Sequence, residues 1–445
     1  MKQLLIEGGH IIDPGMDIDE TGNLFLADGH ISRIHKNNLP PGTYDILDAR
    51  GMIVCPGFID MHCHLRQPGF EEKETIFSGS RAAVKGGFTT ICCMPNTNPP
   101  LDNQSAIDYV KEIASSEAVN RVLPIGCVTD GRQGKILAEL DEMAHAGVVG
   151  FSDDGSPVKD SLIMLKALNY SRTSGLPIID HCEDTSLTGS SLMKGSSLFT
   201  ESELAAIPDT AEQIILARDL LLARLSGGWV HIAHVSSEGS VELIRCAKER
   251  GISVTAEVTP HHLTLTEEIA NSGDSNARVN PPLRTKRDNE ALIKGLKENV
   301  IDIIATDHAP HTENDKSVAF SQAPCGISGL ETALGSLLGL VHRGAIPLKS
   351  LIASLTCKPG RIIGNRYGKL GTLADGAPAD ITIFDPDKKW VVDTASFFSR
   401  GKNTPLKSKK LKGKVMATVY GGRVVYMDSA VTLKKTSISE QDNKS

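Results

Sequence analysis

Apolar and polar residues alternate in short runs over residues 1–53 of the chain. The runs QLLIEGGHIID, NLFLADGHISRI and YDILDAR are separated by Gly and Pro, a pattern typical of strands joined by turns. The same pattern returns near the other end, in KLGTLADGAPADITIFDP, KKWVVD and VMATVYGGRVVYMD. Because chain ends often lie close together, these runs predict one small β-sandwich domain formed by residues 1–53 and 367–430, followed by a polar tail at 431–445.

Between these parts, residues 54–366 alternate apolar strand candidates with amphipathic helix candidates. Eight strand ends follow in order: GFIDMHCH, TTICCMPN, RVLPIGCVT, GVVGFSDD, LPIIDHCED, WVHIAHVSS, ISVTAEVTP and IDIIATDHAP. Helical runs such as AEQIILARDLLLARL and GSVELIRCAKER separate them. Repeated β-then-α units indicate an α/β fold, either a TIM-like (β/α)₈ barrel or an open doubly wound sheet. The open sheet would carry a Gly-rich phosphate turn after an early strand, and its absence favours the barrel.

Composition narrows the classes of function. The chain is 40% hydrophobic and 23% charged with a net charge of -7, and no basic cluster alternates with aromatic residues as a nucleic-acid groove requires. No apolar run approaches the roughly 18 residues that span a bilayer, and the start MKQLLIEGGH lacks the pattern of a signal peptide. The nine cysteines form no paired framework. We therefore expect a cytoplasmic protein that binds neither nucleic acid nor membrane.

The predicted strands end in residues that bind metal ions. These are His62 and His64 on strand one, Asp153 and Asp154 on strand four, His181 on strand five, His234 on strand six, and Asp307 and His308 on strand eight. In a (β/α)₈ barrel these ends form the active site, and His62 and His64 share a face because strand residues alternate. Burial of so many titratable groups without a metal would be costly. Imidazole and carboxylate ligands suit Zn²⁺, although Mn²⁺, Fe²⁺ or Co²⁺ could use the same set.

Several neighbouring polar residues have weaker claims. His231 lies three residues before His234, so we expect it on the opposite face, packing or supporting the site. Asp153 should point away from the site if the next residue points in. His261 and His262 follow strand seven, and two adjacent histidines do not easily bind one ion, so a supporting role and a packing role both stay open.

The motifs around these residues resemble a known family. GFIDMHCHLRQPG, KGGFTTICCMPNTNP, FSDDGSPV, DHCED, HIAHVSS, TAEVTPHHL, NPPLR, IATDHAPH and GISGLETAL closely resemble bacterial type I dihydroorotases of the amidohydrolase superfamily. ADGAPADITIFDP is similar to a segment of the small β domain in that superfamily. The resemblance extends from about residue 3 to residue 427, and it implies the substrate, which composition and periodicity could not indicate.

The resemblance also implies roles for individual residues. It places the metal ligands of a binuclear site, holding one or two Zn²⁺ per chain, at His62, His64, Asp154, His181, His234 and Asp307. Asp307 is also the expected catalytic acid and base. Asp154 stands where many relatives have a carbamylated lysine that bridges two ions. The substrate would be bound by His64, Arg66, Asn96, Asn280, His311, Cys325 and Gly326. The stretch HTENDKSVAFSQAPCG is similar to a mobile loop that covers the site.

The activity implied is the reversible hydrolysis of the cyclic amide of dihydroorotate to N-carbamoyl-aspartate in pyrimidine synthesis. A hydantoinase, dihydropyrimidinase or allantoinase is the first alternative, although these enzymes typically carry the bridging lysine and have less need of Arg66. The second alternative is a non-catalytic partner of aspartate carbamoyltransferase, because some family members assemble with that enzyme. We also expect a homodimer.

Overall fold

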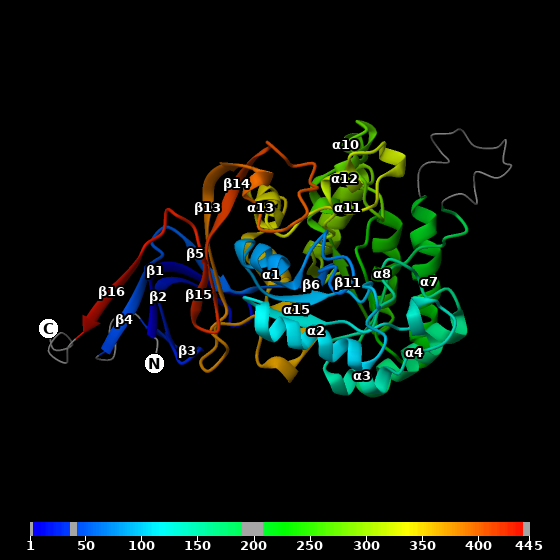
Figure 1. Cartoon of the computed structure of the whole chain (residues 1–445), viewed down its shortest axis with the longest axis horizontal. Helices are drawn as coiled ribbons and strands as arrows, with labels where there is room; N and C mark the ends of the chain where they lie inside the picture. The colour runs from blue at the N-terminus through cyan, green and yellow to red at the C-terminus, as the bar shows by residue number, and fades with distance from the viewer. Residues whose placement is uncertain (1–2, 36–41, 189–207, 439–445) are drawn as a thin grey trace.

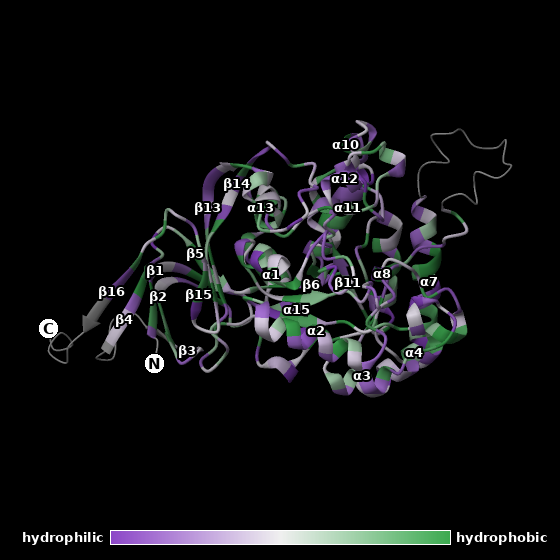
Figure 2. Cartoon of the chain, in the orientation of Figure 1, coloured by the Kyte–Doolittle hydropathy of each residue, from purple (hydrophilic) through white to green (hydrophobic). Residues whose placement is uncertain are grey.

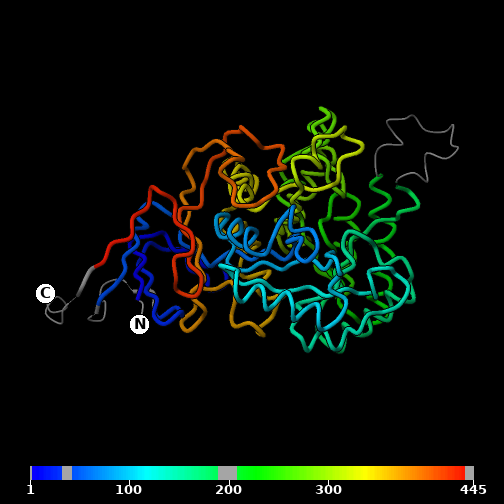
Figure 3. The backbone as a smooth tube through the Cα atoms, in the orientation of Figure 1, coloured from blue at the N-terminus to red at the C-terminus, as the bar shows by residue number. Residues whose placement is uncertain are grey.

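The computed structural model describes residues 3–35, 42–188 and 208–438, which form a mixed sheet beside a barrel of strands and helices (Figure 1). The first and last parts of the chain lie together at one end of the molecule, as the blue and red segments of Figure 3 show. Among the described residues, no helix is both long enough and apolar enough to cross a membrane.

The mixed sheet has nine strands drawn from both ends of the chain. They are β1 (Gln3–Asp13), β2 (Ile18–Ala27), β3 (His30–His35), β4 (Gly42–Asp48), β5 (Ile53–Pro56), β13 (Ile381–Val391), β14 (Lys410–Tyr420), β15 (Arg423–Met427) and β16 (Leu433–Ile438). Their order is β15-β14-β13-β5-β1-β2-β3, with β4 paired to β1 and to β16. The antiparallel pairing of β5 with β13 joins the two halves, as predicted.

The predicted polar tail is wrong at its start. Leu433–Ile438 form β16, which pairs antiparallel with β4 from Leu433 opposite Leu47 to Ile438 opposite Gly42. An unpaired strand edge leaves backbone donors and acceptors without partners. The segment Leu433–Ile438 provides hydrogen-bond partners for the backbone of β4. Residues 439–445, the end of that tail, lie outside the described residues.

The barrel is closed, which confirms the predicted fold class. Its strands are β6 (Phe58–Cys63), β7 (Phe88–Cys93), β8 (Arg121–Pro124), β9 (Ile178–Asp180), β10 (Val230–Ile232), β11 (Val254–Val258) and β12 (Ile303–Ile304). They form two parallel groups, β6-β7-β8 and β12-β11-β10-β9. A bridge between Cys63 and His308 joins the groups on one side, and bridges from Phe151 to Gly126 and to Ile178 join them on the other.

The fourth predicted strand is the exception, because it makes only these single bridges. Phe151 N–H donates to the carbonyl of Pro177, and Val149 N–H donates to that of Pro124. Both prolines lack an N–H, so neither can donate the next hydrogen bond of its ladder, and each ladder stops after one bridge. The segment nevertheless fills the fourth position of the barrel and carries Asp154 to the same end as the other strands.

Helices follow most of the strands and cover the barrel. They are α1 (Ile76–Lys85), α2 (Gln104–Glu117), α3 (Leu140–Ala146), α4 (Ser161–Ser174), α7 (Asp209–Ser226), α8 (Glu238–Glu249), α9 (Pro260–Thr264), α10 (Glu267–Asn271), α11 (Lys286–Lys297), α12 (Glu313–Lys316), α13 (Ala333–His342), α14 (Leu348–Leu355) and α15 (Cys357–Ile363). Local signals set their ends. The Ser237 side chain caps α8 by accepting from Ser240 N, and Gly227 ends α7 at φ 69°, in the left-handed region that glycine allows.

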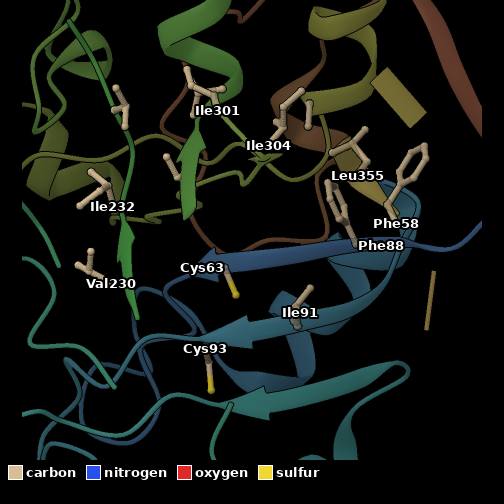
Figure 4. Packing of buried hydrophobic residues seen from close by; sticks show 14 of the residues in the cluster. Phe58, Cys63, Phe88, Ile91, Cys93, Val230, Ile232, Ile301, Ile304 and Leu355 are labelled. Carbon is tan, nitrogen blue, oxygen red and sulfur yellow. The ribbon is translucent and has the colours of Figure 1, made fainter. Parts of the chain in front are cut away.

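Apolar side chains fill both faces of the barrel strands. Ile178 and Ile304 belong to the outer cluster, beneath the helices, whereas their neighbours Ile179 and Ile303 belong to the cluster inside the barrel. Figure 4 shows part of the outer cluster, including Phe58. Strands buried on both faces need apolar residues at successive positions. The candidate ligands lie beyond this apolar packing, at the carboxyl ends of the strands, although Asp60, His231 and Glu257 are buried polar residues within strands.

Candidate active site

Imidazole and carboxylate groups from five positions of the barrel meet at the carboxyl ends of the strands. His62 is the last but one residue of β6 and has no exposed surface, and His64 directly follows the strand. Asp307, just after β12, has its Oδ1 3.1 Å from His64 Nε2 and 3.6 Å from His62 Nε2. These three residues form one group able to hold a metal ion.

Asp154 occupies the centre of the cluster. Its Oδ1 lies 3.6 Å from His62 Nε2, 3.7 Å from His181 Nδ1 and 3.4 Å from His234 Nε2, and its Oδ2 lies 3.5 Å from His64 Nε2. His181 Nδ1 and His234 Nε2 are 2.9 Å apart. One carboxylate thus faces four imidazoles, which is the arrangement expected of a group shared by two ions.

The geometry of these atoms fits a metal. His62 Nε2 and Asp154 Oδ1 are buried and have no hydrogen-bond partner, although burying such groups unpaired is costly. Two ligands each about 2.1 Å from a tetrahedral ion lie about 3.4 Å apart, and the separations of 3.4 to 3.7 Å around Asp154 Oδ1 are close to that value. These separations exceed a normal hydrogen bond, so a cation explains them better than shared protons.

Charge in the cluster also suits a cation. Burial opposes ionisation of Asp154, but the charge of His62 and the close contacts with His181 and His234 outweigh it and hold its pKa well below the usual value. Burial likewise opposes ionisation of Asp307, yet its contact with His64 lowers its pKa. Burial lowers the pKa of His64, which leaves a neutral imidazole able to bind a metal ion. The site therefore presents anionic carboxylates beside a free imidazole nitrogen.

The neighbouring polar residues point elsewhere. The Asp153 carboxylate accepts hydrogen bonds from the backbone N–H groups of Val128 and Thr129, away from the cluster. His231 lies 3.2 Å from Glu257 and 2.8 Å from Thr255. His262 contacts the carbonyl of Pro281 and the hydroxyl of Thr259. His261 Nε2 has no hydrogen-bond partner. Burial lowers the pKa of His261 to about 4, and the charge of Asp307 only partly opposes this effect.

Arg66 lies beside the cluster with its guanidinium half-buried. Its Nε donates to the carbonyl of Pro310 at 3.2 Å, and one Nη lies 3.4 Å from His311 Nε2. Within the part of the chain that the structure describes, Arg66 has no ion pair, although Asp307 and Asp154 act on its charge. Asn96 Oδ1 lies 2.9 Å from His64 Nδ1. This side of the site thus offers one cation, Arg66, and one side-chain amide, Asn96, to a ligand.

The other expected substrate-binding residues lie around the same opening. Asn280 Nδ2 donates to Glu183 Oε2 at 2.7 Å and lies 3.3 Å from His181 Nε2. His311 Nε2 donates to the carbonyl of Cys325 at 2.8 Å. Gly326 has φ 143°, and a Cβ there would come within 2.5 Å of the Ala309 carbonyl. Only glycine therefore allows the backbone to pass so close.

The stretch 312–325 packs against residues 274–278 beside the site. Lys316 Nζ donates to the carbonyls of Ser275 at 3.1 Å and Pro324 at 2.7 Å. Burial is the main cause that lowers the pKa of Lys316 to about 8. Arg278 donates to the carbonyl of Phe320 at 2.8 Å. These bonds fix the position of this loop in the structure.

Sequence reasoning missed two buried carboxylates behind the imidazoles. Glu257 Oε1 lies 2.5 Å from His62 Nδ1, and Glu183 Oε2 lies 2.9 Å from His181 Nε2. Their pKa values are each lowered to about 2, since contacts with these histidines outweigh burial. A signal existed for Glu257, because a lone charged residue in the apolar run ISVTAEVTP needs a buried partner.

Solved structures share the whole architecture of this chain. The L-hydantoinase (dihydropyrimidinase) of Arthrobacter aurescens superposes with a TM-score of 0.87 over 98% of each chain at 26% identity. A dihydropyrimidinase of Brevibacillus agri has the same fold, with a TM-score of 0.84 over 96% of this chain and 95% of its own at 23% identity. A barrel of this kind, a β domain from both termini and a site of imidazoles and carboxylates define a metal-dependent cyclic amidohydrolase.

Sequence comparison narrows the class. A family profile described as Dihydro-orotase-like matches residues 51–240. A dihydroorotase of Aquifex aeolicus is 50% identical over 96% of this chain and 100% of its own. One of Caldanaerobacter subterraneus subsp. tengcongensis is 48% identical over 95% and 97%. The chain belongs to the dihydroorotase family, as the motifs predicted.

Proposed function

We propose that this chain catalyses the reversible hydrolysis of (S)-dihydroorotate to N-carbamoyl-L-aspartate, a step of pyrimidine synthesis. The observation that carries the proposal is Arg66, a half-buried cation without an ion pair among the described residues, beside the acidic centre. The ring carboxylate of dihydroorotate is the partner that it lacks. Family membership with relatives 48 to 50% identical supports this activity over those of the hydantoinases.

The metal in this proposal is Zn²⁺ at a binuclear site. His62, His64 and Asp307 would hold one ion, His181 and His234 would hold the other, and Asp154 would bridge them, as its contacts with all four imidazoles support. When bound, such ions lower the pKa of a coordinated water to about 7 and polarise a carbonyl oxygen. Lys159 is exposed and on the far side of a turn, which supports Asp154 rather than a lysine as the bridge.

Asp307 is the proposed catalytic residue. Its contact with His64 keeps it ionised, so its carboxylate can accept the proton of the attacking water. It then passes that proton to the ring nitrogen as the amide bond breaks, the role of a general acid and base. In the direction of ring closure, Asp307 takes the proton from the attacking ureido nitrogen.

Arg66 orients the substrate. Its planar guanidinium can form two parallel hydrogen bonds to a carboxylate, and Asn96 and His311 flank it to complete the hydrogen bonding. Asn280 and the backbone at Cys325 and Gly326 line the remaining side of the ring. The scissile amide is thereby held toward Asp307.

The decisive experiment compares two substrates on one zinc-loaded preparation of the lone chain. We expect kcat/KM for dihydroorotate to exceed that for dihydrouracil by about 10⁴-fold or more, because a site built for a polar group rejects an analogue that lacks it. Comparable values would instead support the dihydropyrimidinase activity. Absence of turnover in either direction would support the non-catalytic alternative.

For the assembly we propose a homodimer through α7. Ile214, Leu221 and Leu225 are 44%, 65% and 72% exposed at helical spacing, and Figure 2 shows the hydrophobic residues of α7 at the edge of the molecule. Ile214 and Leu221 flank the small Ala217, so two antiparallel copies of α7 could pack Leu221 of each copy against Ile214 of the other. The same pairing brings the acidic first turn of one copy toward Arg224 of the other, which favours a second copy as the occupant.

Analytical ultracentrifugation tests this assembly. The unmodified chain should sediment as a dimer, and Leu221→Glu should give a monomer because it places a charge in the apolar contact. Ile136→Glu is the matched control, since Ile136 is equally exposed at 65% but lies outside α7. The proposal would be overturned by a monomeric parent chain or by a Leu221→Glu variant that stays dimeric. It would also be overturned if that variant lost binding to aspartate carbamoyltransferase without a change in its oligomeric state.

A cytoplasmic location completes the proposal. All nine cysteines are free, and seven of them are buried. Reduced thiols are typical of reducing compartments. Localisation of a fluorescent fusion in cells would test it.

A further inference from the structure

Glu257 connects the two halves of the metal cluster from behind. It lies on β11 with no exposed surface, and its Oε1 is 2.5 Å from His62 Nδ1. The same oxygen accepts the backbone N–H of His234 at 3.2 Å. His62 belongs to one proposed ion position and His234 to the other, so a single carboxylate oxygen touches both.

The second oxygen of Glu257 is held by a chain of buried donors. Oε2 lies 3.2 Å from His231 Nε2, and His231 Nδ1 lies 2.8 Å from Thr255 Oγ1. Trp229 Nε1 donates to Thr255 Oγ1 at 2.9 Å. An indole nitrogen can only donate, so the Thr255 hydroxyl proton is free to go to His231 Nδ1. His231 then donates from Nε2 to the carboxylate, and every proton in the chain points toward Glu257.

This order of protons fixes the state of His62. A carboxylate accepts hydrogen bonds and has no proton to give, so His62 must carry its proton on Nδ1. In the neutral ring, which is the form that binds a metal ion, Nε2 then carries the lone pair. That atom is buried, lacks a hydrogen-bond partner and faces Asp154 and Asp307. The ring cannot turn over without breaking its bond to Glu257.

We propose that Glu257 is a positioning residue of the metal centre, which sets the proton and ring orientation of His62 and the backbone of His234, with His231 and Thr255 holding its other oxygen. This inference rests on the metal centre of the proposed function but not on its substrate. A carboxylate behind a ligating histidine strengthens metal binding, and its loss typically weakens metal affinity about 10 to 100-fold.

The test uses Glu257→Gln in the full chain, with Glu331→Gln as the matched control. Glu331 is also a buried carboxylate, with a side chain 2% exposed that accepts from Phe398 N and Ser399 N, and it contacts none of the candidate ligands. The zinc dissociation constant is measured by competition with a chelator, without substrate, and the visible spectrum is recorded with Co²⁺ in place of zinc. Thermal unfolding of the metal-free proteins is measured alongside.

We expect Glu257→Gln to bind zinc about 10 to 100-fold more weakly with an altered Co²⁺ spectrum, and Glu331→Gln to match the parent chain in both. Thr255→Val should cause a smaller loss in the same direction, and it decides the question if Glu257→Gln does not fold. An unchanged zinc affinity and Co²⁺ spectrum, with only a lower melting temperature, would mean a structural role and overturn the proposal. If dihydroorotate is not turned over but zinc affinity falls as stated, the proposed substrate fails and this inference stands.

Discussion

Several residues at the site hold backbone conformations that other residues avoid. Arg66, His234 and Asp307 have φ values of 62°, 33° and 45°, in the left-handed region where a side chain costs free energy. Each such residue costs about 1 to 3 kcal/mol, and such costs persist where the surrounding structure holds the residue for function. All three residues take part in the proposed reaction. Holding their side chains toward the site therefore lowers the free energy of unfolding of this protein.

The first prediction concerns Arg66. Arg66→Ala should lower kcat/KM for dihydroorotate about 100-fold, mainly through KM, because two charged hydrogen bonds at about 1.5 kcal/mol each are lost. Zinc content should stay the same, since Arg66 is no candidate ligand. Arg50→Ala is the control, because Arg50 is exposed and pairs with Asp48 in the mixed sheet. Steady-state kinetics with metal analysis checks the result, and a loss of zinc would contradict the assigned role.

The second prediction separates two adjacent carboxylates. Asp154→Ala should lower the zinc bound per chain, because the shared ligand is gone. Asp153→Ala should keep its zinc but unfold at lower urea concentration, since the N–H groups of Val128 and Thr129 lose their acceptor, at about 1 kcal/mol or more for each buried donor. Activity should not depend on added bicarbonate, since Asp154 needs no carbamylation. If Asp153→Ala lost zinc and Asp154→Ala kept it, the roles assigned to the two carboxylates would have to be exchanged.

The candidate ligands could be predicted from the sequence because each lies at the end of an apolar strand run, and barrel topology brings such ends together. The carboxylates behind them could not. Glu257 and His62 are 195 residues apart, and the register that brings β11 across from β6 is not encoded in local periodicity. Strand-end position therefore predicts which side chains meet at the candidate site, and only the structure identifies the carboxylates that contact them from behind.

At the scale of elements, the sequence patterns predicted the helices α7 and α8 and most of the strands, but not every ladder. The runs predicted for α7 and α8 agree with the structure to within a few residues, because the helical period and end signals lie within each run. The prediction of a regular fourth strand was wrong, because the prolines that limit its ladder lie on the neighbouring strands. β16 was missed because its pairing with β4 depends on a strand far away in the sequence. The domain boundaries at 53 and 366 stay predictions.

The third prediction concerns the loop 312–325. Lys316→Met should release it, because the carbonyls of Ser275 and Pro324 lose a buried donor. Amide hydrogen exchange should rise within the loop, and KM for dihydroorotate should increase several-fold with a smaller change in kcat, because the carbonyl of Cys325 positions His311. Lys111→Met, which removes a lysine from α2, is the control. Unchanged exchange would mean that other contacts hold the loop.

At the scale of the molecule, the candidate ligands come from five positions around the barrel wall. A metal bound there ties together segments as far apart in sequence as β6 and the residues after β12, so it should stabilise the closed barrel as a whole. Binding to the native state alone stabilises it in proportion to ligand excess. The metal is therefore expected to be part of the fold as well as of the chemistry.

The fourth prediction follows from this. Removing zinc with a chelator should lower the melting temperature by several degrees, and adding it back at about 1,000 times its dissociation constant should restore about 4 kcal/mol. His64→Ala should show a smaller response to zinc, whereas His145→Ala, on the exposed surface of α3, should respond like the parent chain. Differential scanning calorimetry measures all four conditions. Equal melting temperatures with and without zinc would contradict the prediction.

The sheet formed from both termini has a consequence for synthesis on the ribosome. Cys55 on β5 contacts Thr382 on β13, 327 residues later in the chain. At about 5 to 20 residues per second, β13 follows β5 by roughly 15 to 65 s, and throughout that time one edge of β5 has no partner. The barrel can close before the first strands of the mixed sheet have all their partners. A nascent chain of this protein therefore spends most of its translation with an open strand edge, which is the surface that chaperones cover and that premature termination would leave exposed.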